Sequence, residues 1–165
     1  MLKEKIQHNL EEAVKNKKDL ETLVLRLINA AILNREKEKR FKISKEKENV
    51  SEVDLEKESQ LTDEEVVEIL SSEVKKRKEA IEEFEKGGRK DLAEREKKEL
   101  EILQNYLPKQ LSEEEVKNLA KEVIKEVEAK EIKDMGRVMS ELMPKVKGRT
   151  DGSLVSKIVK ELLTS

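Results

Sequence analysis

Residues 61–88 read LTDEEVVEILSSEVKKRKEAIEEFEKGG, and this stretch contains the start, the apolar stripe and the stop of one helix. Thr62 and Glu65 have the spacing of a capping box, which satisfies free backbone N–H groups in the first turn. Apolar residues then recur at helical intervals along one stripe: Val66, Leu70, Val74, Ile81 and Phe84. Gly87-Gly88 predicts the end of the helix, because glycine accepts the left-handed conformation that a C-cap needs.

The same helical period continues toward the N-terminus. It predicts one helix over roughly 2–17 and a second from Asp19 to about Arg40. The second has a wide apolar face that we expect to be buried, formed by Leu20, Leu23, Val24, Leu27, Ile28 and Ala31. Residues 41–60 are polar and lose the apolar rhythm. We therefore predict an exposed, variable linker there, with room for some helix.

Toward the C-terminus, a further helix carries Leu92, Glu96, Leu100, Leu103 and Leu107 and stops before Pro108. Ser112 and Glu115 repeat the capping-box signal, and three amphipathic segments follow it. The sequence thus predicts an all-α protein. Residues 1–107 form an N-terminal helical domain of antiparallel helix hairpins, and 108–165 form a small C-terminal three-helix domain.

The composition excludes several kinds of protein. Charged residues make up 45% of the chain, but 36 Lys and Arg nearly balance 38 Asp and Glu, so net charge points to no partner. There is no cysteine, which removes disulfides, thiolate zinc sites and iron–sulfur clusters. No apolar run approaches the roughly 18 residues of a membrane span, and we see no signal-peptide core. We expect a cytoplasmic protein without a membrane partner.

No set of residues in the sequence predicts catalysis. The single histidine, His8, lies among charged neighbours, and Ser71-Ser72 fall inside a predicted helix, away from any glycine-rich nucleophile loop. Adjacent carboxylates such as Glu64-Glu65 are expected by chance in a chain with so many acidic residues. Phosphate-binding, dinucleotide and EF-hand motifs are absent. We predict no catalytic residue, no metal ligand and no cofactor.

One segment departs from this pattern. Residues 133–160 contain seven basic residues, Lys133, Arg137, Lys145, Lys147, Arg149, Lys157 and Lys160, against three acidic ones, in a chain whose net charge is -2. Gly148 can end one helix and Asp151 can cap the next, where Gly152 and Ser153 would offer free N–H groups. A helix start beside several cations is suited to binding phosphate.

The competing interpretation of this segment is structural. Gly148 and Asp151 would then act only as helix caps, and the cations would complement the end of the preceding helix. Gly136 lies on an otherwise apolar helix, where it would let another backbone approach closely. Aromatic residues are not interleaved with the cations, so an RNA contact would depend on backbone and shape, not on base stacking.

Several segments, taken in order, resemble one known family. The C-terminal ones are KDMGRVM at 133–139, MPKVKGRTDG at 143–152 and LV at 154–155. Others are LRL at 25–27, AAI at 30–32, NRE at 34–36, LTDEE at 61–65, KR at 76–77, Phe84, GGRKD at 87–91, ELEIL at 99–103 and YLP at 106–108. Together they resemble the YqeY family over nearly the whole chain, with the weakest match at 41–60.

The resemblance carries an implied function. The family is similar to the tail of the B subunit of glutamine-dependent tRNA amidotransferases, which binds the elbow of tRNA, and to the N-terminal region of some glutaminyl-tRNA synthetases. It implies an N-terminal helical domain followed by a small three-helix domain. By this resemblance and the local basic pattern, the predicted RNA-contacting residues are Gly136, Arg137, Lys145, Lys147, Gly148, Arg149, Gly152 and Lys157.

We therefore predict a non-catalytic tRNA- or RNA-binding adaptor that acts beside an amidotransferase or an aminoacyl-tRNA synthetase. One alternative is a carbon–nitrogen ligase that takes its amido group from glutamine, which rests on the family resemblance alone, because nothing here corresponds to the amidotransferase catalytic domain. Another is a helical module for protein–protein interaction. The sequence does not specify the oligomeric state.

Overall fold

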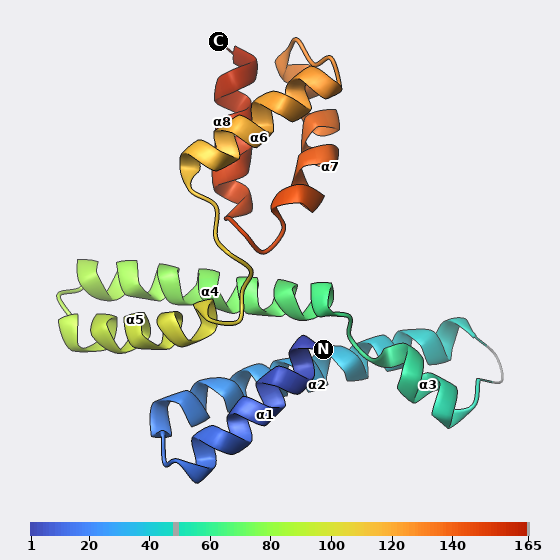
Figure 1. Cartoon of the computed structure of the whole chain (residues 1–165), viewed down its shortest axis with the longest axis vertical. Helices are drawn as coiled ribbons and strands as arrows, with labels where there is room; N and C mark the ends of the chain where they lie inside the picture. Colours follow the sequence, from blue (N-terminus) through green and yellow to red (C-terminus); the bar gives the residue numbers. More distant parts are fainter. Residues whose placement is uncertain (48–49, 165) are drawn as a thin grey trace. The chain divides into compact units, whose positions relative to one another are not determined.

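The computed structural model describes residues 1–47 and 50–164. Within these ranges the chain consists of helices and their connections, without a strand (Figure 1). The prediction of an all-α protein is therefore confirmed. The chain divides into two compact units, Met1–Tyr106 and Leu107–Ser165.

The N-terminal unit contains helices α1 (Leu2–Lys15), α2 (Asp19–Glu46), α3 (Glu52–Ser59), α4 (Asp63–Lys86) and α5 (Lys90–Gln104). Helices α1 and α2 form one hairpin, and α4 and α5 form another (Figure 1). The short α3 packs against α2. Leu107, which we expected on the last of these helices, lies beyond the end of α5.

The predicted start and stop of α4 are confirmed. The Thr62 hydroxyl accepts a hydrogen bond from the Glu65 N–H at 3.2 Å, and the Glu65 carboxylate accepts one from the Thr62 N–H at 2.7 Å. At the other end, Gly88 has φ +70°, and the Arg89 N–H donates to the Phe84 carbonyl at 2.8 Å. This is a Schellman turn, which closes the helix.

Replacing Gly88 with alanine is expected to destabilise the N-terminal unit by about 1 kcal/mol, because a Cβ is strained at positive φ. A Cβ there would meet no atom within 4 Å, so the substitution tests backbone strain without a steric clash. The control is Gly136→Ala. Gly136 also has free space around its Cα, but it lies within α7 and its φ is not positive, so this substitution should be neutral or stabilising. Urea unfolding measures both, and equal losses would contradict the expectation.

Within 41–60 the described residues are mostly exposed, as predicted, but they contain more helix than we expected for a partly helical linker. Helix α2 continues to Glu46 and α3 occupies Glu52–Ser59, while residues 48–49 lie outside the described ranges. Lysine and glutamate favour helix, and no glycine or proline stops α2. The Ser51 hydroxyl caps α3 by accepting from the Asp54 N–H at 3.2 Å. Helical propensity thus outweighs the missing apolar rhythm.

The predicted burial of α2 was wrong on one side. Val24, Leu25, Ile28 and Ile32 are fully buried. Leu23 and Leu27, which we expected beside them, are 40% and 49% exposed. The helix is apolar around much of its circumference, but the N-terminal unit covers only one side of it.

The α4–α5 hairpin encloses an ion pair. Arg77 and Glu99 are each 6% exposed, and Arg77 Nη2 lies 3.2 Å from Glu99 Oε2. Arg77 Nη1 also contacts Glu73 Oε2 at 3.0 Å, and Arg95 Nε contacts Glu99 Oε1 at 3.3 Å. Burial raises the pKa of Glu73, but hydrogen bonds from Lys76 and Arg77 outweigh it and leave that pKa below its ordinary value.

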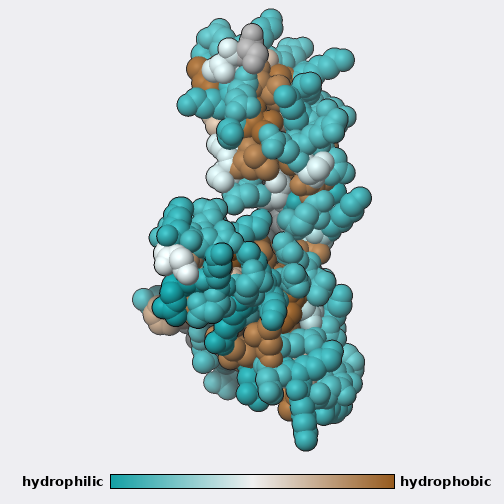
Figure 2. Space-filling model, turned by 90° about the vertical axis from the view of Figure 1, so that its left-hand side faces the viewer, coloured by the Kyte–Doolittle hydropathy of each residue, from teal (hydrophilic) through white to brown (hydrophobic). Residues whose placement is uncertain are grey.

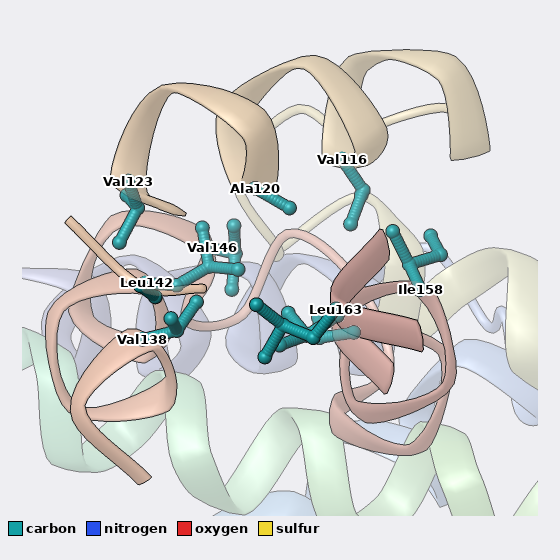
Figure 3. Packing of buried hydrophobic residues seen from close by; sticks show 11 residues of the cluster. Val116, Ala120, Val123, Val138, Leu142, Val146, Ile158 and Leu163 are labelled. Atoms are coloured by element: carbon teal, nitrogen blue, oxygen red, sulfur yellow. The ribbon is translucent and has the colours of Figure 1, made fainter. Parts of the chain in front are cut away.

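The C-terminal unit consists of α6 (Glu113–Glu126), the 3-10 turn η1 (Ile132–Asp134), α7 (Met135–Val146) and α8 (Gly152–Thr164). Its core is entirely aliphatic, and Figure 3 shows side chains from all three α-helices meeting there. The buried set comprises Val116, Ala120, Val123, Ala129, Val138, Leu142, Val146, Val155, Ile158, Val159 and Leu163. This core fixes the ends of α7 and α8, where the basic segment lies.

Candidate nucleic-acid interface

The turn between α7 and α8 carries the centre of the basic segment. Gly148 has φ +69°, as its predicted role in ending α7 requires, and the Arg149 N–H donates to the Val146 carbonyl at 2.9 Å. Asp151 then caps α8. Its carboxylate accepts hydrogen bonds from the Ser153 N–H at 2.8 Å and the Ser153 hydroxyl at 2.7 Å. Both predicted caps are confirmed.

The α8 start differs from our prediction in one respect. We expected the Ser153 N–H to be free for a phosphate, but it is bound to the Asp151 carboxylate. This acidic group also places negative charge where an anionic ligand would lie. A Cβ on Gly152 would meet Met143 Cε at 3.5 Å, an ordinary contact, so packing does not require glycine there. The helix start alone is therefore a poor phosphate site.

Gly148 and Arg149 hold the segment that enters α6. The Leu111 N–H donates to the Arg149 carbonyl at 2.7 Å, and Gln110 Nε2 donates to the Gly148 carbonyl at 2.8 Å. The Arg149 side chain donates from Nε to the Lys109 carbonyl at 3.3 Å. Both residues are only partly exposed. Their contacts show a structural role, which the sequence pattern alone left open.

The remaining predicted cations are exposed: Arg137, Lys145, Lys147 and Lys157. Arg137 pairs with Asp134 at 3.0 Å, Lys145 with Glu126 at 2.9 Å, and Lys157 with Glu161 at 4.0 Å. Exposed pairs of this kind contribute about 0–1 kcal/mol, so a phosphate group can displace the carboxylate at little cost. The ion-pair partners of Arg137, Lys145 and Lys157 are side-chain carboxylates, whereas the Arg149 side chain donates to a backbone carbonyl.

The excess of positive charge in residues 133–160 is partly neutralised by acidic residues from outside this segment. Glu126, which pairs with Lys145, and Glu131, which pairs with Lys133 at 2.9 Å, both lie outside that window. Over residues 107–165 the sequence has 12 Lys and Arg and 11 Asp and Glu. Any nucleic-acid contact therefore depends on where cations lie on the surface and not on the charge of the whole unit.

Gly136 lies on an exposed part of α7. A Cβ there would meet no atom within 4 Å, so no part of the described chain uses the space that this glycine leaves. It borders an open depression of about 400 Å³ together with Val127, Arg137, Ser140 and Glu141. The close approach that we predicted at Gly136 is thus available to a ligand.

Asp134 organises the start of α7 next to this depression. Its carboxylate accepts hydrogen bonds from the Lys130 N–H at 2.9 Å and the Glu131 N–H at 3.2 Å. These two backbone donors, and then Arg137, hold the pKa of Asp134 below its ordinary value. Arg137 is thereby anchored at the edge of the depression, with its guanidinium 3.0 Å from a charged carboxylate.

The other chemistry considered in the sequence has little support in the structure. His8 is exposed, and Ser71 lies within α4 and donates its hydroxyl to the Val67 carbonyl at 2.8 Å. Among residues 1–47 and 50–164, no cluster of three or more His, Asp or Glu side chains is arranged to hold a metal ion. Within the same ranges, no helix has the length and apolar character needed to cross a membrane.

These features define an all-α protein of two helical units, the second of which carries a basic turn and an exposed glycine. Comparison with known proteins gives its family. Residues 47–163 match the family described as Yqey-like protein. The chain therefore belongs to the YqeY family, as the sequence motifs indicated.

Two curated relatives are similar over part of the chain. One, from Pyrenophora tritici-repentis, is named altered inheritance of mitochondria protein 41, mitochondrial, and is 32% identical over 62% of this chain and 58% of its own length. An uncharacterized protein of Schizosaccharomyces pombe is 45% identical over 31% of this chain and 42% of its own length. The chain thus spans about half the length of these relatives.

Proposed function

We propose that this protein is a non-catalytic adaptor that binds tRNA, or a similarly structured RNA, through the α7–α8 face of its C-terminal unit. The observation that carries the proposal is that four of the predicted cations on α7, α8 and the turn between them are exposed: Arg137, Lys145, Lys147 and Lys157. Such cations contact phosphates without selecting sequence. The amidotransferase and synthetase partners belong to the same proposal and rest on the family resemblance.

Replacing Lys145, Lys147 and Lys157 together with glutamine is expected to weaken tRNA binding about tenfold or more, because phosphate contacts dominate such affinities. Fluorescence anisotropy with labelled total tRNA measures this at two salt concentrations. The salt dependence should also fall, by about one unit of logarithmic slope for each phosphate that the variant no longer neutralises. Arg149 is left intact because its side chain holds the segment that enters α6.

The matched control replaces three exposed lysines of α6, Lys117, Lys121 and Lys125, with glutamine. It removes the same charge from the same unit and should change tRNA binding little. Equal weakening by the two triple variants would show that only net charge matters and would contradict a defined face. Absence of salt-sensitive binding by the wild-type chain at about 100 µM would remove the RNA-binding proposal altogether.

Gly136→Ala separates binding from stability. The added methyl group should leave folding unharmed, since it enters open space. If RNA backbone approaches α7 at this glycine, the same methyl group must weaken tRNA binding. A variant that is at least as stable as wild type but binds less tRNA would place the ligand at Gly136, while unchanged binding would exclude that position.

The cytoplasmic location expected from the sequence stays a prediction, and the Pyrenophora relative is mitochondrial by its name. A ligase activity has no observation in its favour among the residues that the structure describes. The protein-interaction alternative has one, on the outer face of α2, which is argued next.

A further inference from the structure

The outer face of α2 is apolar although it is open to solvent. Leu23, Leu27, Leu33 and Phe41 are 40%, 49%, 44% and 60% exposed. With 3.6 residues per turn, Leu23, Leu27, Ala30 and Phe41 share one side, opposite the fully buried Val24, Ile28 and Ile32. Asn34 and Lys37 lie on the same side between Ala30 and Phe41, so Leu23, Leu27 and Ala30 form one apolar patch and Phe41 a second. Single exposed leucines are ordinary on protein surfaces, but several apolar residues along one side of a helix mark a contact surface. Figure 2 shows apolar patches within a mostly hydrophilic surface.

The charges around this stripe are mainly positive. Arg26 and Lys37 are exposed on the same outer side of α2, and neither forms an ion pair with any residue in the described ranges. The Lys45 ammonium lies 4.5 Å from the centre of the Phe41 ring. Glu38, at the other edge of the stripe, is paired with Arg35 at 3.2 Å. From Arg26 to Lys45 the stripe therefore has a cationic border.

Apart from Glu38, the acidic groups beside this surface lie at the N-terminal end of α2. There α2 and α5 enclose an open depression of about 440 Å³, whose lining includes Leu20, Leu23, Asp19 and Glu94. The apolar surface thus continues into a shallow groove at the N-terminal end of α2. A partner meets mixed charge in this groove and positive charge along the remaining length.

We propose that this α2 face docks an amphipathic helix of a protein partner, with aliphatic residues on one side and glutamate or aspartate on the flanks of that side. Leu23 to Phe41 covers about 27 Å at roughly 1.5 Å per residue, so a helix of about 18 residues fits. An apolar ridge laid along an apolar stripe is a common mode of helix recognition. Acidic flanks complement Arg26 and Lys37.

The charges favour this occupant over two others. A second copy of the chain would bring two cationic borders together, and like charges across an interface oppose association. A membrane-surface helix buries its apolar side among the lipids and keeps its cations on the opposite side, whereas Asn34 and Lys37 lie on the same side as Leu23 and Phe41. An amphipathic helix with acidic flanks would cover the apolar residues of α2 and pair with its cations. With the RNA face on the other unit, it would make the protein a link between RNA and a protein partner.

The test uses the full chain and a fluorescent peptide of about 18 residues, with leucines at helical spacing and glutamates on both flanks. A second peptide keeps the leucines and replaces the glutamates with lysines. Fluorescence anisotropy should show that the acidic peptide binds and that Leu27→Ser weakens it about tenfold or more. Val53→Ser, at a residue of α3 that is 62% exposed, is the matched control and should leave binding unchanged.

The double variant Arg26→Glu, Lys37→Glu should reverse the preference, so that the lysine peptide binds better than the glutamate peptide. Equal affinity for both peptides, or no binding of the acidic peptide at about 1 mM, would overturn the proposal. So would a dimer in sedimentation, or pelleting with phosphatidylglycerol vesicles, that Leu27→Ser abolishes while the acidic peptide does not bind. Leu27→Ser should leave tRNA binding intact, which keeps this test independent of the RNA-binding proposal.

Discussion

Arg77→Met is expected to lower the free energy of unfolding of the N-terminal unit by about 3 kcal/mol, because it leaves the buried Glu99 carboxylate without its main partner. Glu99 keeps Arg95, whose Nε lies 3.3 Å away, so the loss should fall at the lower end of the range for broken buried pairs. Urea unfolding can be followed by the fluorescence of Tyr106, the single tyrosine, which belongs to this unit. The chain has no tryptophan, so no other strong fluorophore contributes to the signal.

The double variant Arg77→Met, Glu99→Leu should recover most of that loss. Two apolar side chains of similar size remove the charge instead of stranding it, and such replacements are often neutral or stabilising. Arg77 Nε is buried without a hydrogen-bond partner in the described structure, which makes the native arrangement less favourable than its ion pairs suggest. If the double variant instead lost as much as the two single variants combined, side-chain packing and not charge would explain the effect.

Lys97→Met supplies the control within the same hairpin. Lys97 also joins α5 to α4, through Glu85 at 2.8 Å, but its side chain and that of Glu85 are 41% and 51% exposed. Exposed pairs contribute about 0–1 kcal/mol, so this variant should unfold almost as the wild type does. Comparable losses for Arg77→Met and Lys97→Met would contradict the role assigned to burial.

The sequence contained a signal for this buried pair that we did not use. The apolar stripe of α4 has a gap between Val74 and Ile81, and Arg77 occupies the position that fills it. A cation at a core position of a helix predicts a buried acidic partner, but the partner's identity depends on how α5 lies against α4. Glu96 was the acid we placed on the apolar stripe of α5, whereas the structure buries Glu99. These two residues are three positions apart, about one helical turn, so the way α5 lies against α4 decides which of them is buried.

Local signals were predicted well because they depend on neighbouring residues. The capping boxes at Thr62 and Ser112 and the turn at Gly148 need only their own few residues. The exposed side of α2 could not be predicted, since Leu23 and Ile28 look equally apolar in sequence. Which side is covered depends on helices distant along the chain. The role of Arg149 was hidden for the same reason, because its acceptor is a backbone carbonyl 40 residues away in sequence.

Leu142→Ala is expected to remove about 3 kcal/mol from the C-terminal unit, since Leu142 is fully buried in its aliphatic core. A single core in a domain of this size supplies roughly 3–5 kcal/mol, so the unit should lose most of its stability. Hydrogen exchange by mass spectrometry resolves the two units. The hydrogen-exchange protection factors of peptides from 107–164 should fall about a hundredfold, and those of peptides from 1–106 should stay unchanged.

Met143→Ala, at the neighbouring position, is the control, because Met143 is 36% exposed and its truncation should cost less than about 1 kcal/mol. Equal loss of protection in the two variants would contradict the core assignment shown in Figure 3. The Leu142→Ala variant also separates the two binding proposals. A chain whose C-terminal unit has lost most of its stability should bind tRNA more weakly and still bind the acidic peptide at α2, since only the first surface depends on the core around Leu142.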